Sequence, residues 1–187
     1  MRKILPVLWF CLCTIFFLTA FSPAGNIYVT RTGHIWFFSK APLENIEAHN
    51  RQASSSLNIE TGEMAFQVLI KGFEFQKALM QEHFNENYME SSKFPKATFK
   101  GKIKNPAAVK FRKAGTYNVE VEGELTIHGV TNFVSAPGTI TVNKDGINAA
   151  SGFKVALKDY NITIPSLVKD KIAEIIDITV EMNYKPK

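Results

Sequence analysis

Cysteine is scarce in this 187-residue chain, and its two cysteines, Cys11 and Cys13, both lie in an apolar stretch near the N-terminus. The chain contains no CxxC pair, and no serine lies in a G-x-S-x-G turn. The four histidines form neither an HxH nor an HExxH pattern. The local signatures of zinc sites and of cysteine or serine nucleophiles are therefore missing. The sequence predicts a protein that is not an enzyme and that holds no metal and no cofactor.

Long apolar runs are also rare, and the one that occurs has the layout of a secretory signal peptide. Two basic residues precede an apolar run over residues 4–21, and the small residues Ser22 and Ala24 follow it. We predict that residues 1–24 are removed, which gives a periplasmic or secreted protein without cysteine. An uncleaved membrane anchor is the alternative, because the run is nearly long enough to span a bilayer. Residues 25–187 are then one domain held together by its core alone.

Charge of one sign is not concentrated anywhere in the chain. The net charge of the full chain is +5, and its lysines are spread among glutamates. A nucleic-acid partner is therefore not expected, because such proteins carry basic blocks or patches. Contact with a membrane is expected to be transient at most.

Polar and apolar residues alternate along most of the chain, which is typical of antiparallel strands with one wet and one dry face. The clearest runs are TYNVEVEGELTI (116–127), SGFKVALKDYNITI (151–164) and EIIDITVEMNY (174–184), and EMAFQVLIKGFEF (63–75) is similar. In the second run the alternation slips near Lys158, which predicts a bulge. Turn sequences with glycine separate the runs. The pattern predicts an all-β antiparallel barrel, and a two-layer sandwich is the alternative.

One stretch, FQKALMQEHFNENYMESSKFPKATF (75–99), breaks the strand rhythm and predicts a helix from about Lys77 to Tyr88. A second short helical turn is predicted within residues 165–175. An apolar stripe on the first helix is either its buried side or a lid over the barrel mouth, and the two roles are compatible. The mouth or lid residues are Leu79, Met80, His83 and Phe84.

The dry faces of the predicted strands are expected to face the barrel interior. A barrel of about eight strands either holds one ligand or is filled by its own side chains. The 15 phenylalanines suit both an apolar cavity and a solid core, so both stay open at this point. For a ligand-binding lumen, the predicted lining residues are Phe66, Val68, Ile70, Phe99, Tyr117, Val119, Val121, Leu125, Ile127, Phe153, Val155, Leu157, Ile178, Val180 and Met182.

His128 is the histidine whose position invites a chemical role. It belongs to the polar side of the run GELTIHGVTNFV (123–134) and comes directly before Gly129. A lone titratable group lacks the partner that catalysis requires. We interpret His128 as a rim residue whose ring bonds a backbone group and holds the turn.

The same run resembles the G-x-L-T-I-H-G-V-T-K-P-V segment of the YceI-like family of bacterial envelope proteins. Upstream, FPKATFKGKI (94–103) resembles the Y-P-x-A-T-F motif of that family, at the expected distance. GHIWFFSKAPLENIEAHN (33–50) and GFKVALKDYNITIP (152–165) also line up in kind. The resemblance thus covers residues 27–184.

The resemblance implies a lipocalin-like barrel of about eight strands with one or two short helices. It further implies a periplasmic protein that holds a long polyisoprenoid, such as an isoprenoid quinone, without catalytic residues. The segment QKALMQEHFNENYMESSKF (76–94), which closes the mouth, departs from the family pattern, and Asn132, Phe133 and Val134 stand at its K-P-V step. We therefore predict a carrier or store of an apolar lipid in the cell envelope, with one continuous tunnel; a homodimer is compatible with the sequence. The alternative is a non-catalytic structural or interaction barrel with a filled core.

Overall fold

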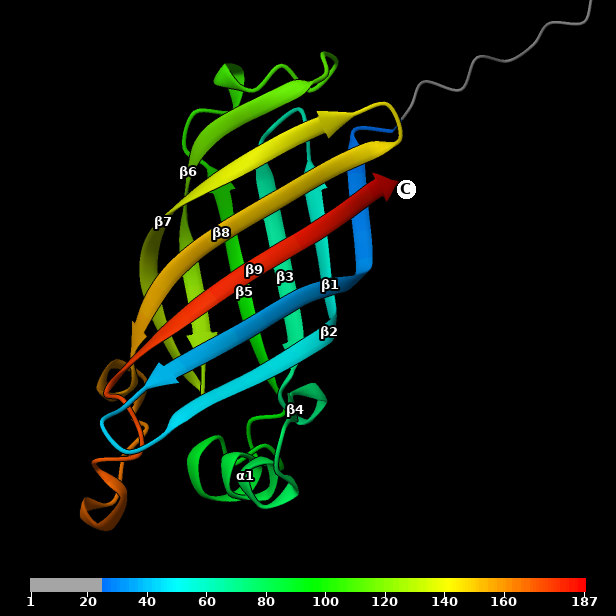
Figure 1. Cartoon of the computed structure of the whole chain (residues 1–187). Coiled ribbons are helices and arrows are strands. Elements are labelled where there is room, and N and C mark those ends of the chain that lie inside the picture. The colour runs from blue at the N-terminus through cyan, green and yellow to red at the C-terminus, as the bar shows by residue number, and fades with distance from the viewer. Residues whose placement is uncertain (1–24) are drawn as a thin grey trace, which may run out of the picture.

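The computed structural model describes residues 25–187, and the predicted signal peptide at residues 1–24 lies outside the described residues. The chain forms one sheet in the order β1-β9-β8-β7-β6-β5-β3-β2-β4, and β1 also pairs with β2 (Figure 1). β4 (Glu74–Phe75) is a two-residue addition beside β2. The other eight strands close an antiparallel barrel, so the predicted barrel is confirmed over the sandwich. These strands are β1 (Ile27–Lys40), β2 (Asn45–Asn58), β3 (Glu63–Leu69), β5 (Lys96–Ile103), β6 (Gly115–Ile127), β7 (Val130–Asn143), β8 (Gly146–Ala156) and β9 (Ile175–Pro186).

The hairpin between β6 and β7 shows how the sequence sets the strand register. The two strands pair without interruption from Gly115 with Val142 to Ile127 with Val130. His128 and Gly129 form the turn, with φ of 51° and 76°. Positive φ at both central residues is the geometry of a two-residue turn that follows the natural twist of the strands. The prediction that His128 holds a turn is therefore confirmed in its backbone.

The predicted strand over residues 151–164 ends earlier than its alternation indicated. β8 stops at Ala156, and the 3₁₀ turn η4 (Leu157–Tyr160) follows, with Asn161 in the left-handed conformation at φ 55°. The slip near Lys158 is therefore the end of a strand, and the predicted bulge is wrong. Tyr160 and Ile162 stay buried although they leave the sheet, because the segment folds back over the barrel wall. Burial without strand geometry produced the misleading pattern.

The helical elements lie mainly at one end of the barrel. The predicted helix is present as α1 (Ala78–His83), which continues into the π turn η2 (Phe84–Tyr88). The second predicted turn contains η5 (Ser166–Val168). Two further 3₁₀ turns are η1 (Ile70–Gly72) and η3 (Pro106–Ala108). No helix in residues 25–187 is long and apolar enough to cross a membrane.

The opposite end of the barrel is packed solid. Leu57, Ile103 and Tyr184 are almost completely buried there, and the Tyr184 and Ser55 hydroxyls lie 2.7 Å apart in a buried hydrogen bond. Burial raises the pKa of Tyr184, so the phenol stays neutral and needs only this one polar partner. We call this end the closed end, and the end that carries α1 the open end.

Candidate ligand-binding cavity

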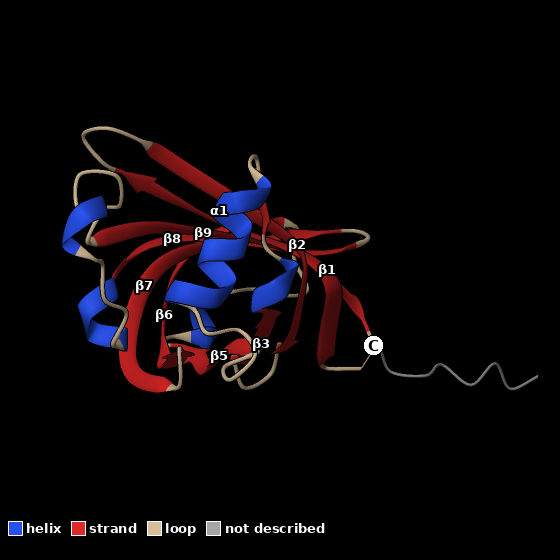
Figure 2. Ribbon diagram, turned by 90° about the horizontal axis from the view of Figure 1, so that it is seen from below, coloured by secondary structure: helices blue, strands red, loops and turns tan. Residues whose placement is uncertain are grey.

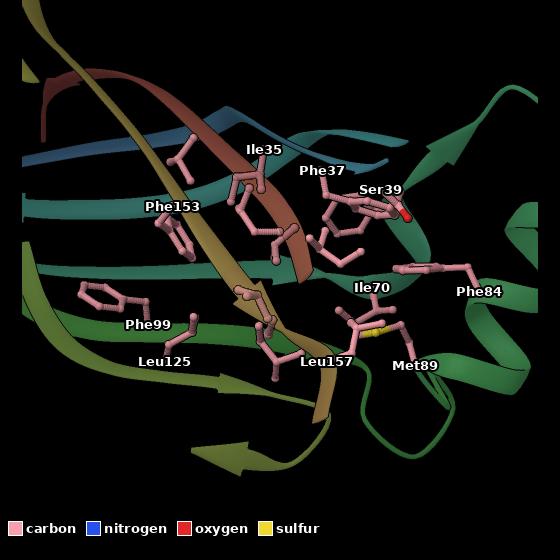
Figure 3. A pocket seen from close by; sticks show the side chains of 18 of the residues that line it. Ile35, Phe37, Ser39, Ile70, Phe84, Met89, Phe99, Leu125, Phe153 and Leu157 are labelled. Atoms are coloured by element: carbon pink, nitrogen blue, oxygen red, sulfur yellow. The ribbon is translucent and has the colours of Figure 1, made fainter. Parts of the chain in front are cut away.

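The barrel is hollow from the open end down to Met64 and Met182, and its cavity has a volume of about 570 Å³. Its wall is made of apolar side chains from most of the strands and from the helical cap, by which we mean α1 and η2 with the following Met89 and Glu90 (Figure 3). Phe99, Leu125 and Phe153 lie within the barrel, while Phe84 and Met89 come from the cap. The volume falls within the range of small-molecule binding sites. The expected continuous space inside the barrel is present, and because the closed end is packed it is a blind cavity.

Fourteen of the fifteen predicted lumen residues line this cavity, and their contact with a ligand stays a prediction. The exception is Tyr117, which lies on β6 toward the closed end and packs against its core. Its hydroxyl donates to the Lys113 carbonyl at 3.1 Å. Tyr117 lies on the inner face of β6, as predicted, but too near the closed end to reach the cavity. Alternation indicates the face on which a residue lies, but not its position along the barrel axis.

Several lining residues were not predicted. Ile35 and Phe37 of β1 face the cavity, as do Phe73, directly before β4, and Phe75 of β4. In β1 the outward-facing Trp36 and Phe38 are also aromatic, so the alternation of polarity that marks other strands is hidden there. The segment around Phe73 is a turn, to which a period of two does not apply.

The cap is anchored by an aromatic cluster at the mouth. The ring of Phe84 stacks on Phe37, with centroids 5.5 Å apart, and contacts Phe73 and Phe75 at 5.7 and 5.0 Å. Such contacts stabilise by about 0.5–1.5 kcal/mol each beyond the burial of area. The predicted mouth residues Leu79, Met80, His83 and Phe84 all line the cavity. α1 lies across the open end when the molecule is viewed from that side (Figure 2).

His128 ties the cap to the barrel wall. One ring nitrogen, Nδ1, lies 3.1 Å from the Tyr160 carbonyl oxygen, and Nε2 lies 2.8 Å from Oε2 of Glu90 at the end of the cap. Both partners carry hydrogen-bond acceptors, and the imidazole bridges them. The Phe94 ring packs edge-on against the imidazole at 4.6 Å. The predicted bond to a backbone group is confirmed, and His128 serves as a structural tie between three segments.

One part of the barrel wall is not a continuous sheet. β7 pairs with β8 only over Gly138–Asn143, which faces Gly146–Ser151. The first part of β7, Val130–Pro137, pairs with β6 alone. Ser151 Oγ donates to the Pro137 carbonyl at 2.8 Å, so the missing N–H of this proline faces the unpaired side. The segment after β8 covers the gap: Leu157 and Ile162 line the cavity there, and Asn132 Nδ2 donates to the Asp159 carbonyl at 2.7 Å.

Polar groups on the cavity wall are few, and two of the interior hydroxyls already have partners. Ser39 Oγ accepts the Ala173 N–H at 2.9 Å, and Ser151 donates as described above. The ionisable lining groups belong to segments at the mouth: Glu44, Lys77, His83, Tyr88 and Lys171. Among residues 25–187, no group of three or more His, Cys, Asp or Glu side chains is placed to hold a metal ion. The cavity therefore suits an apolar guest whose polar end lies at the mouth.

A separate polar cluster lies on β1 and β2, away from the cavity lining. His34 Nε2 and His49 Nδ1 are 3.0 Å apart, Arg51 lies 3.4 Å from His34 Nδ1, and His49 Nε2 faces Glu47 at 3.3 Å. Because Arg51 is a donor, His34 Nδ1 accepts its N–H, which leaves His34 Nε2 to donate to His49 Nδ1. Burial, followed by the Arg51 charge and His49, lowers the pKa of His34, which agrees with a neutral ring.

The fold and the cavity define a class of protein: a closed antiparallel β-barrel with a blind apolar cavity beneath a helical cap. A sequence model of the YceI-like domain matches residues 30–184, and the chain belongs to the YceI-like family. No curated protein shows a significant match to the chain.

Solved structures share the fold at low sequence identity. A polyisoprenoid binding domain from Saccharophagus degradans superimposes with a TM-score of 0.75 and 13% identity, covering 87% of this chain and 99% of the other. BcnA from Burkholderia cenocepacia gives 0.67 and 17%, covering 80% and 94%. The YceI protein of Campylobacter jejuni gives 0.54 and 18%, covering 75% and 86%. At these identities the similarity shows the fold.

Proposed function

We propose that this protein binds one long apolar lipid, an isoprenoid quinone or a related polyisoprenoid, inside the barrel and acts as its carrier or store in the cell envelope. The observation that carries the proposal is the apolar cavity of about 570 Å³. The similar domain from Saccharophagus degradans is described as polyisoprenoid binding, which supports the same class of ligand. The cavity also favours ligand binding over a structural barrel with a filled core, because only the closed end is filled.

The physical mechanism is burial of the lipid chain. Each methylene group moved from water into the cavity contributes about 0.8 kcal/mol, so ten of them contribute about 8 kcal/mol before the costs of association. The wall offers aromatic and branched side chains but few free polar groups, so affinity comes from the tail. The polar end of the ligand is then placed at the mouth, beside Lys77, His83 or Lys171.

The remaining parts of the proposal concern cellular context. We propose a non-catalytic protein that is exported after removal of residues 1–24 and works in the periplasm or outside the cell. The absence of local catalytic motifs and the family membership support a binding role. Homodimer formation and transient membrane contact are compatible with this role.

Mass spectrometry of protein purified from its native host tests the proposal. Native spectra should show a mass increment of lipid size on the folded protein, and solvent extraction should release an isoprenoid lipid. A bare mass in protein from the native host, together with failure to take up a polyisoprenoid added in detergent, would overturn it.

A further inference from the structure

Three exposed leucines lie in the segments at the open end of the barrel, while Leu69, Phe133 and Ile175 are exposed on β3, β7 and β9. Leu167 is 94% exposed, Leu43 is 71% exposed and Leu79 is 60% exposed. They belong to η5, to the loop between β1 and β2, and to α1. We call these three leucines the mouth rim. At the closed end, the exposed large apolar side chain in the described part of the chain is Ile27, at 36%.

The three segments of the mouth rim are joined to one another around the cavity opening. The Leu43 N–H donates to the Asp170 carbonyl at 2.9 Å, next to η5. Lys77 at the start of α1 forms an ion pair of 3.1 Å with Glu44. Each segment also contributes to the cavity lining, through Glu44, Leu79 or Val168. The segments that carry the exposed leucines therefore border the cavity at the open end, where α1 lies across the barrel (Figure 2).

This arrangement fits a fluid apolar surface better than a folded partner. A stable protein interface needs a continuous, well-packed patch of about 800 Å² on each side. The mouth rim consists of separate projecting side chains around an opening, so a rigid partner would face a hole at its centre. A lipid layer adapts to such a shape, and its acyl chains would continue directly into the apolar cavity.

The charges beside the mouth rim fit the headgroup region of a bilayer. A lysine lies within three residues of each leucine: Lys40 near Leu43, Lys77 near Leu79, and Lys169 near Leu167. Lysine side chains at an interface keep the ammonium at the phosphate level while neighbouring apolar side chains insert. Acidic residues in the same segments leave the rim only slightly basic. Insertion of the leucines should therefore dominate, and salt should weaken binding little.

We propose that the mouth rim docks on the surface of a lipid bilayer, so that the cavity opens directly into the hydrocarbon. The proposal rests on the proposed lipid-binding function and names the surface through which the ligand enters and leaves. It assigns Leu43 and Leu167 a role that packing does not explain, because both face solvent, and it gives the exposed part of Leu79, which also lines the cavity, the same role.

Flotation of residues 25–187 with phosphatidylcholine vesicles tests the proposal. This segment contains the whole closed barrel and lacks the N-terminal apolar run, which would bind vesicles by itself. Leu167→Ser should reduce vesicle binding about tenfold, the effect of removing one inserted side chain. The matched control Ile27→Ser, at the closed end, should leave binding unchanged. In a second pair, Leu167→Trp should be quenched by brominated lipid and Ile27→Trp should not.

The outcomes separate this proposal from the proposed function. Protein that carries lipid in native mass spectra but does not float, or floats equally with Leu167→Ser, overturns the docking surface and leaves the lipid-binding function intact. Protein that floats through its leucines but takes up no lipid overturns the function and supports the surface. A dimer that forms through the same leucines and excludes vesicles would also overturn bilayer docking.

Discussion

Filling the floor of the cavity should weaken lipid binding while leaving the barrel folded. Ala149 of β8 lines the cavity and packs against the core of the closed end. Ala149→Trp would place an indole in the deepest part of the empty space. If the ring displaces four methylene groups of the ligand, the loss is about 3 kcal/mol, or roughly a 200-fold weaker affinity. The longest lipid chain that fits should also become shorter.

The same substitution at a matched position provides the control. Ala65 of β3 is exposed and is not part of the lining, so Ala65→Trp should leave affinity unchanged. Affinity is measured by titration with polyisoprenoids of graded length, and folding by circular dichroism and thermal unfolding. Filling an existing cavity should avoid most of the cost of about 1–3 kcal/mol that overpacking a solid core carries. A folded Ala149→Trp protein that binds long chains like the wild type would refute the reasoning.

Four further predictions address the rest of the molecule. Leu57→Ala, at a fully buried site of the closed end, should lower the free energy of unfolding by about 2–5 kcal/mol in urea titrations, and a loss below 1 kcal/mol would show that this end is loosely packed. His128→Asn tolerates the left-handed backbone but loses the bond to Glu90, so it should destabilise by about 1–3 kcal/mol; an unchanged melting temperature would contradict the tie. Because the folded-state pKa of His34 is lowered from 6.5, the unfolded chain takes up a proton first, and stability should fall as pH drops below that value. His34→Gln should remove this fall in stability at low pH. An identical pH profile of stability in the variant would show that His34 does not cause it. N-terminal sequencing of the exported protein should begin at Gly25, whereas a retained Met1 would support the uncleaved anchor.

The strand faces could be predicted from the sequence because alternation is a direct consequence of strand geometry. Val119, Val121 and Leu125, which this period assigns to one face of β6, all line the cavity. Depth along the barrel could not be predicted in the same way. Tyr117 continues the same alternation but lies toward the closed end, because residues far away in sequence, such as Val109 and Phe111, fill the interior there.

The site was harder to predict where two faces of a strand are equally apolar or where the chain leaves the sheet. Phe37 was missed because its neighbours on the outer face are also aromatic. Leu157 lines the cavity from a 3₁₀ turn and not from the predicted strand. The point where the pairing of β7 with β8 ends depends on the register between distant residues. In the sequence, only Pro137 indicates this point.

A crystal structure of the protein purified from its native host without detergent tests the central claim most directly. The account predicts continuous, elongated electron density for one lipid in the cavity, with its tail between Leu125 and Phe153 and its polar end at the mouth near Lys77 and His83. Density for side chains that collapse into this space, or a lipid bound only on the outer wall, would contradict it.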